Sequence, residues 1–122
     1  MTHLEIIRLY FDCWLSQNPE YLPQIFSKDI VYTECYGPQY QGIEQILHWF
    51  RDWNKIGKVL EWNLLETWDY DDTLIVKWFF RYKYQNNSDC FDGISLIHFD
   101  ELNKICSIEE FKSVHIHVFP YN

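Results

Sequence analysis

The sequence has few glycine, proline and cysteine residues and no long apolar segment. Its 122 residues include only four glycines and four prolines, and no apolar run approaches the roughly 20 residues that a membrane-spanning helix needs. The four cysteines, Cys13, Cys35, Cys90 and Cys106, form no CxxC pair and lie far apart. We therefore expect reduced thiols in the core rather than a disulfide framework or a metal site.

Positive charge is also scarce. Ten Lys and Arg residues face 18 Asp and Glu residues, which gives a formal net charge of −8. Binding to a nucleic-acid backbone or to an anionic membrane surface requires clustered positive charge, so we expect neither partner. The first residues, Met1 to Glu5, lack the basic-then-apolar order of a signal peptide, which predicts a cytoplasmic protein.

Aromatic residues are abundant. They make up 20% of the chain, as six Trp, nine Tyr and nine Phe, within a globular composition of 48% hydrophobic and 23% charged residues. The length predicts a single domain over residues 1–122. Such large, flat side chains either fill a core completely or line a cavity, and the composition leaves both possibilities open.

Three helices are predicted in the first half of the chain. Thr2 and Glu5 have the spacing of a capping box at the start of a helix over residues 3–16. Asn18-Pro19 predicts the start of a second, short helix. Apolar residues recur at helical spacing again over residues 43–54, which predicts the third helix.

The remaining segments are predicted to be strands. Residues 30–36 form a β-rich run before the third helix, and alternating patterns then predict four antiparallel strands, at residues 60–70, 74–84, 91–99 and 105–111. Glu66 interrupts an apolar face, so we expect it to reach the mouth of a pocket or to pair with a hydroxyl there. The fold class is α+β, with three N-terminal helices packed on a strongly curved, mostly antiparallel sheet that forms a cone with an internal pocket.

Several short segments, in this order and spacing, suggest a family. They are Leu9 to Phe11, Ile25 to Val31, Gly37 to Ile46, Ser95 to Phe99, and Lys104-Ile105. With them the chain resembles the nuclear-transport-factor-like superfamily, in the SnoaL-like branch that includes steroid Δ5-isomerases and polyketide cyclases. The resemblance implies a cystatin-like α+β roll, no cofactor, and a homodimer formed through the outer face of the sheet.

That outer face is predicted to be mixed in character. Lys77, Phe79, Arg81 and Lys83 alternate with the inward residues of their strand. This surface is too apolar to remain wholly wet, which agrees with the expected homodimer.

The resemblance also implies two catalytic residues. Aligned without a gap to a steroid isomerase, Glu34 falls at the general base and Tyr10 at the phenol that stabilises the oxyanion. Desolvation in an aromatic pocket would raise the pKa of Glu34 toward neutrality. A buried phenol could donate to a developing oxyanion. The alternatives are a rim carboxylate at Glu34 and simple packing at Tyr10.

Two further positions bear on the reaction. The second oxyanion donor of the isomerase, an acid, falls at Ile97 or close to it, which weighs against steroid isomerase activity because an apolar side chain cannot donate. The polyketide cyclases keep an acidic base near Glu110, and strand alternation places Glu110 on the same face as Ile108. The alternative is that Glu110 pairs at the rim with Lys112 or an arginine.

Six aromatic residues and one aliphatic residue are the predicted walls of the pocket: Trp14, Trp53, Trp62, Trp78, Phe80, Tyr82 and Ile97. Three functions stay open: binding of a small, apolar, planar molecule; a cofactor-free isomerase, cyclase or dehydratase-like enzyme; and an interaction protein with a filled pocket. No metal is expected, because His115 and His117 alone are too few ligands.

Overall fold

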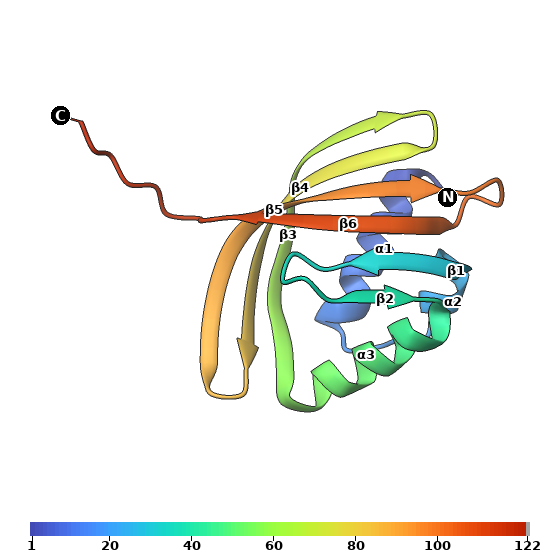
Figure 1. Cartoon of the computed structure of the whole chain (residues 1–122), viewed down its shortest axis with the longest axis horizontal. Coiled ribbons are helices and arrows are strands. Elements are labelled where there is room, and N and C mark those ends of the chain that lie inside the picture. Colours follow the sequence, from blue (N-terminus) through green and yellow to red (C-terminus); the bar gives the residue numbers. More distant parts are fainter. Residues whose placement is uncertain (122) are drawn as a thin grey trace.

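Three helices pack on one curved, unclosed sheet of six strands (Figure 1). The computed structural model describes residues 1–121, and Asn122, the end of the expected domain, lies outside the described residues. The helices are α1 (His3–Leu15), α2 (Leu22–Ile25) and α3 (Ile43–Ile56). The strands are β1 (Phe26–Thr33), β2 (Gln39–Gln41), β3 (Gly57–Tyr70), β4 (Thr73–Tyr84), β5 (Asn87–Phe99) and β6 (Ile105–Ser113). The predicted α+β class is confirmed.

The strand order places β1, from the first third of the chain, beside β6, the last strand. It runs β2-β1-β6-β5-β4-β3, with every neighbouring pair antiparallel except β1 and β6, which are parallel. In the β1–β6 ladder Tyr32 lies opposite Ile108, and Thr33 opposite Glu109. The residues that follow β1 therefore lie beside the second half of β6, although 76 positions separate Tyr32 from Ile108 in the sequence.

Helix α1 begins with the predicted capping box. The Glu5 amide donates to Thr2 Oγ1 at 3.1 Å, and the Thr2 amide donates to Glu5 Oε1 at 2.9 Å. Its buried face consists of Ile6, Ile7, Tyr10, Phe11, Cys13 and Trp14. Within residues 1–121, no helix combines the length and the apolar character that crossing a membrane requires.

The second helix starts later than Asn18-Pro19 predicts. Its first residue is Leu22, and Pro23 occupies the first turn. Asn18 instead closes a local turn, because its Oδ1 accepts from the amide of Glu20 at 3.0 Å. An asparagine side chain satisfies a turn and a helix cap equally well, which explains the error.

The first strand also differs from its predicted bounds. It begins at Phe26 rather than at residue 30, and it ends at Thr33, so Tyr36 lies in the following turn. The short strand β2 was missed entirely. Its sequence, Gln-Tyr-Gln, has no β-branched residue and no apolar alternation, so it carries no strand pattern.

Glu66 faces outward, contrary to expectation. The register between β3 and β4 shifts between Leu64 and Glu66, so that Leu64 lies opposite Trp78 while Glu66 lies opposite Lys77 on the other face. A bulge adds one residue to a strand and exchanges the faces of everything beyond it. Glu66 is therefore on the outer surface and takes no part in the interior.

A glycine on β5 makes room for the largest buried side chain. A Cβ atom at Gly93 would lie 2.2 Å from the indole Cη2 of Trp78, which is opposite it in the ladder. Trp78 is 2% exposed, and its Nε1 donates to Ser95 Oγ at 2.9 Å. The indole of Trp78 therefore packs directly against the backbone of β5 at Gly93, which is where glycine is required on the concave face.

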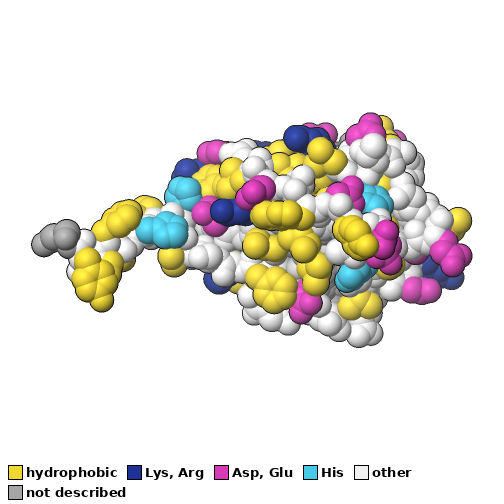
Figure 2. All heavy atoms as spheres, turned by 90° about the horizontal axis from the view of Figure 1, so that it is seen from above, with side chains coloured by type: hydrophobic (Ala, Val, Ile, Leu, Met, Phe, Trp, Pro, Cys, Tyr) yellow, Lys and Arg dark blue, Asp and Glu magenta, His cyan; other side chains and the backbone are white. Residues whose placement is uncertain are grey.

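The chain beyond β6 extends away from the body as a tail (Figure 1). Five hydrophobic residues of the tail are mostly exposed: Val114, Ile116, Val118, Phe119 and Tyr121. Figure 2 shows hydrophobic side chains along this tail, and others gathered among charged groups on one face of the body.

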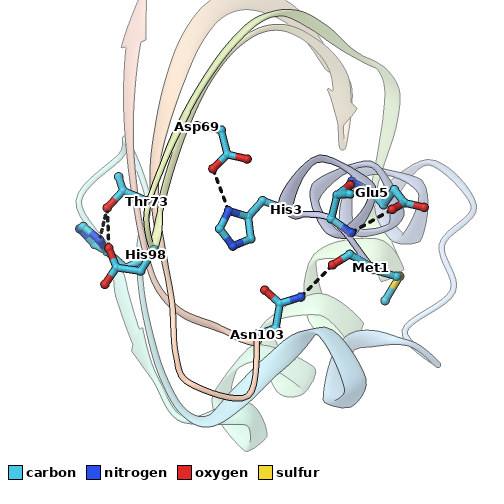
Figure 3. A network of polar contacts seen from close by, with 9 residues as sticks. Met1, His3, Glu5, Asp69, Thr73, His98 and Asn103 are labelled. Carbon is cyan, nitrogen blue, oxygen red and sulfur yellow. Dashed lines mark hydrogen bonds and ion pairs between the residues drawn. The ribbon is translucent and has the colours of Figure 1, made fainter.

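Polar contacts attach the start of α1 to the sheet (Figure 3). His3 Nδ1 lies 2.8 Å from Asp69 Oδ1 at the end of β3, and the His3 ring stacks on Phe99 with centroids 3.8 Å apart. Asn103 Nδ2, in the turn between β5 and β6, donates to the carbonyl oxygen of Met1 at 2.8 Å. This cluster joins both halves of the chain.

Candidate functional site

A cavity of about 520 Å³ lies between the helices and the concave face of the sheet. Its volume is in the range of small-molecule sites. Thirteen of its nineteen lining residues are aromatic. The lining consists of Tyr10, Trp14, Tyr32, Glu34, Cys35, Tyr36, Tyr40, Trp49, Asp52, Trp53, Ile56, Val59, Trp62, Trp78, Phe80, Tyr82, Tyr84, Phe91 and Glu110. The six aromatic walls expected from the sequence all contribute.

Ile97 is the exception among the expected wall residues. It is fully buried, lies opposite Leu74 and Ile108 in the sheet, and belongs to the closed part of the core rather than to the lining. On the neighbouring strand β6, Glu110 lies two positions beyond Ile108, the partner of Ile97, and does line the cavity. A carboxyl group is therefore present in this part of the cavity, from β6 and not from β5.

Glu110 ends a buried chain of hydroxyl groups. Tyr10 donates to the Tyr32 hydroxyl at 2.8 Å, and Tyr32 donates to Glu110 Oε2 at 2.6 Å. Burial raises the pKa of Glu110 to about 8, the charge of Glu34 adds to this rise, and the Tyr32 hydrogen bond opposes it. Glu110 is therefore a neutral acid through most of the physiological range and a carboxylate above it.

Glu34 lies just beyond β1 and also lines the cavity. Its Oε2 accepts from the Tyr40 hydroxyl at 3.0 Å. Burial raises its pKa, while the Tyr40 hydrogen bond acts in the opposite direction. The parallel pairing of β1 with β6 thus places a second perturbed carboxyl group in the cavity with Glu110.

Tyr10 lines the cavity, but its hydroxyl group already has an acceptor. It donates to Tyr32, so it could serve an oxyanion only by exchanging that partner. Burial, followed by the charge of Glu110, raises the pKa of both phenols well above the ordinary value for tyrosine. Both hydroxyls therefore act as donors and not as bases.

Lys112 does not pair with Glu110. Its Nζ lies 4.7 Å from the centre of the Tyr36 ring and 5.4 Å from that of Phe91, in the geometry of a cation–π contact. Both rings line the cavity. The rim alternative for Glu110 is therefore replaced by a partly buried hydrogen bond to Tyr32.

Sequence reasoning missed ten of the nineteen lining residues, and three of these, Tyr32, Tyr40 and Trp49, lie beside the polar groups of the site. Tyr32 is two positions before Glu34 in the extended chain, so strand alternation places both on one face and could have revealed it. Tyr40 lies on the unpredicted strand β2. Trp49 on α3 stacks on Tyr40 with ring centroids 4.4 Å apart, a contact that depends on that same strand.

Two indole groups of the lining are polar but unpaired. Among the described residues, Trp14 Nε1 and Trp62 Nε1 are buried and have no hydrogen-bond partner. An unsatisfied buried donor costs about 1–3 kcal/mol. The folded chain therefore leaves both of these buried donors without an acceptor.

The histidines and cysteines of residues 1–121 form no cluster of the kind that holds a metal ion. Within residues 1–121, no three His, Cys, Asp or Glu side chains are grouped so that they could hold an ion. His115 Nδ1 instead pairs with Asp92 Oδ1 at 2.9 Å, and its ring packs against Phe79. All four cysteines are free thiols.

Several solved structures of other proteins have a similar fold. A hypothetical protein with a ketosteroid isomerase-like fold from Catenulispora acidiphila, solved with trimethylamine, has a TM-score of 0.79 at 18% identity over 89% of this chain and 85% of that chain. An LEH-like epoxide hydrolase of M. tuberculosis has a TM-score of 0.81 at 8% identity, over 91% and 82%. A cystatin-like protein of unknown function from Xanthomonas campestris has a TM-score of 0.75 at 13% identity, over 93% and 92%.

A search of curated proteins finds no match. The model of the SnoaL-like domain, in contrast, matches residues 7–108, which is most of the chain and runs from within α1 to within β6. The chain therefore belongs to the SnoaL-like domain family.

Proposed function

We propose that this protein binds a small, flat, largely apolar molecule in the aromatic cavity. The observation that carries the proposal is a cavity of about 520 Å³ in which thirteen of nineteen lining residues are aromatic. Aromatic faces bury flat apolar molecules well and prefer offset or edge contacts with them. The Catenulispora protein of similar fold, crystallised with trimethylamine, is a precedent for a small ligand.

A few polar groups would orient such a molecule. The Glu110 carboxyl group with Tyr32, and the Glu34 carboxyl group with Tyr40, belong to the lining. Sites of this kind commonly combine apolar walls with a small number of polar contacts that fix orientation.

Closing the cavity tests this proposal. Ile56 lines the cavity and is 48% exposed, so an Ile56→Trp variant should obstruct the opening without disturbing the core. Leu60→Trp is the matched control, because Leu60 is 43% exposed and does not line the cavity. We expect 2-naphthol, followed by tryptophan fluorescence and calorimetry, to bind one to one and about ten-fold more weakly to Ile56→Trp alone. Absence of saturable binding of planar aromatic probes to the wild type would contradict the proposal.

Proton transfer is a second candidate function, favoured by the two perturbed carboxyl groups. Glu34, as a carboxylate of raised pKa, would remove a proton next to a carbonyl group. Glu110, still protonated at neutral pH, would donate a hydrogen bond to the resulting oxygen anion. Tyr10 would act through Tyr32 by keeping Glu110 in place. Isomerases and cyclases share this step, and it needs no cofactor.

Exchange of carbon-bound hydrogen tests this second function directly. In deuterium oxide, 2-tetralone exchanges its α-hydrogens, and NMR follows the rate. We expect the wild type to exceed the buffer rate and Glu34→Gln to lose about 100-fold or more of that excess, the usual contribution of a general base. Equal background rates in both proteins would remove the base role of Glu34 while leaving the binding proposal intact.

We also propose that the protein is a homodimer through the outer face of the sheet. That face exposes four large hydrophobic residues, Leu65, Trp68, Ile94 and Phe111, whose exposed fractions lie between 38% and 54%. Charged neighbours such as the Arg81–Glu61 pair surround them. Sedimentation should give a dimer at micromolar concentration and a monomer for Phe111→Glu. A monomeric wild type would contradict this.

A further inference from the structure

The lining of the cavity contains acidic side chains but no basic ones. Three carboxyl groups belong to the lining, Glu34, Asp52 and Glu110, and none of the lining residues in the described part of the chain is Lys, Arg or His. Asp52 already has partners at the surface, since it lies 2.9 Å from His48 Nε2 and 3.4 Å from Lys55 Nζ. Glu34 and Glu110 have only tyrosine hydroxyls as partners.

The walls of the cavity are suited to positive charge as well. The face of an aromatic ring carries negative partial charge and attracts a cation within about 6 Å. Two of the lining rings, Tyr36 and Phe91, already do so, because the Lys112 ammonium group lies 4.7 Å and 5.4 Å from their centres. These rings are thus arranged so that one cation reaches both of them.

Lys112 reaches these rings from the same face of β6 as Glu110. The ladder to β5 places Glu110 opposite Ser95, and Lys112 opposite Gly93, on the inward side. Lys112 itself is exposed and forms no hydrogen bond or ion pair in the described structure. Its ammonium group is therefore a tethered cation that a second cation could replace.

We propose that the natural ligand is an organic cation, a tertiary or quaternary ammonium compound or a protonated nitrogen heterocycle, held between aromatic faces beside Glu34 and Glu110. This inference rests on the proposed small-molecule binding and names the chemical class of the ligand. An anion would find no positive side chain among the lining residues, only the Lys112 ammonium group at the Tyr36 and Phe91 rings, and it would lie beside two carboxyl groups. A neutral molecule would use the rings but leave an ionised carboxyl group of Glu34, or of Glu110 at higher pH, without a counter-charge.

A pair of ligands with equal shape and different charge tests the inference. Phenyltrimethylammonium and tert-butylbenzene differ by one positive nitrogen in place of carbon, and benzenesulfonate supplies the anionic comparison. Measured by tryptophan fluorescence at about pH 9, where Glu110 is ionised, the cation should bind at least about ten-fold more tightly than the neutral probe. Benzenesulfonate should bind most weakly of the three.

Matched variants test whether Glu110 and Lys112 determine the preference for the cation. Glu110→Gln should weaken binding of the cation about ten-fold and leave tert-butylbenzene nearly unchanged, whereas Glu109→Gln, on the opposite face of β6, should change neither. Lys112→Gln should tighten binding of the cation about three-fold by removing the tethered competitor.

The outcomes separate this inference from the proposed function. If the neutral probe binds as tightly as the cation, or if Lys112→Gln weakens binding of the cation, the ligand is not a cation, while small-molecule binding stands. If none of the three probes binds, both the proposed function and the inference are overturned.

Discussion

Two polar clusters in this fold use similar groups in different surroundings. At the start of α1, His3 pairs with Asp69 near the surface, where water still reaches the carboxylate, whose side chain is 50% exposed. In the cavity, Tyr10, Tyr32 and Glu110 form a chain of comparable bond lengths in which both phenols are buried. Burial, not the presence of a partner, is what raises the pKa of Glu110.

The difference shows what each cluster can do. An exposed pair joins two segments of chain and contributes little free energy, because water competes for the hydrogen-bonding groups of both partners. A buried carboxyl group is costly to ionise, and it therefore changes protonation at a pH where the surface carboxylates are already charged. The His3–Asp69 pair therefore connects two segments of the fold. The Tyr10–Tyr32–Glu110 cluster offers a ligand a carboxyl group whose protonation can change.

The largest expected difference between the two clusters is in their effect on how protein stability changes with pH. Between the ordinary pKa of 4.5 and about 8, folded Glu110 holds a proton that the unfolded chain has lost. Stability should therefore fall as pH rises through this window, by up to about 1.4 kcal/mol per pH unit from this group. Glu110→Gln should flatten the curve measured by urea unfolding from pH 5 to 9.

Glu109→Gln is the control for that experiment, since Glu109 is exposed on the outer face and should leave the slope unchanged. Parallel curves for the wild type and Glu110→Gln would show that Glu110 titrates as an ordinary carboxyl group.

Added volume beside the cavity should have the next largest effect. Gly93→Ala places a methyl group 2.2 Å from the indole of Trp78, which is buried and tied to Ser95 and so cannot move away freely. We expect the unfolding free energy to fall by about 2–3 kcal/mol. Ile94→Ala, on the outer face and 38% exposed, should cost clearly less. Equal losses would mean that the concave wall is not close-packed.

Removing the middle of the hydroxyl chain should cost less again. Tyr32→Phe deprives Glu110 of its donor and Tyr10 of its acceptor, for a loss of about 1–3 kcal/mol. Because the Tyr32 bond lowers the pKa of Glu110, its loss should also move the pH-dependent region upward. Tyr10→Phe removes only the outer bond and should have the smaller effect. A larger loss for Tyr10→Phe would contradict the order of the chain.

The smallest effect is expected at the exposed cluster. Asp69→Asn should change the unfolding free energy by less than about 1 kcal/mol, and added salt should reduce the difference further. Thermal unfolding at low and high ionic strength measures both. A loss as large as that of Tyr32→Phe would mean that the two clusters are energetically alike.

Local patterns were sufficient to predict most of the fold. The Thr2–Glu5 capping box and the apolar spacing after it defined α1, and clean alternation defined β4, because both depend on neighbours in sequence. Glu66 was misplaced because a bulge after Leu64 exchanges the faces of β3, and nothing in the local sequence marks the bulge.

The candidate site was predictable only in part. Glu34 and Glu110 were identified as acids, but the partner of Glu110 is Tyr32, 78 residues away, which the parallel β1–β6 pairing brings into contact. Tyr40 escaped notice because β2 carries no strand pattern. Bonds of this kind depend on the register of distant strands, which a single sequence does not encode locally.

The central claim is that the cavity keeps Glu110 protonated near neutral pH. Carbon-13 NMR of protein labelled at the glutamate carboxyl carbons measures this directly, with Glu110→Gln identifying the resonance. The account predicts a midpoint at about 8 for Glu110. A midpoint near the ordinary 4.5 would contradict it.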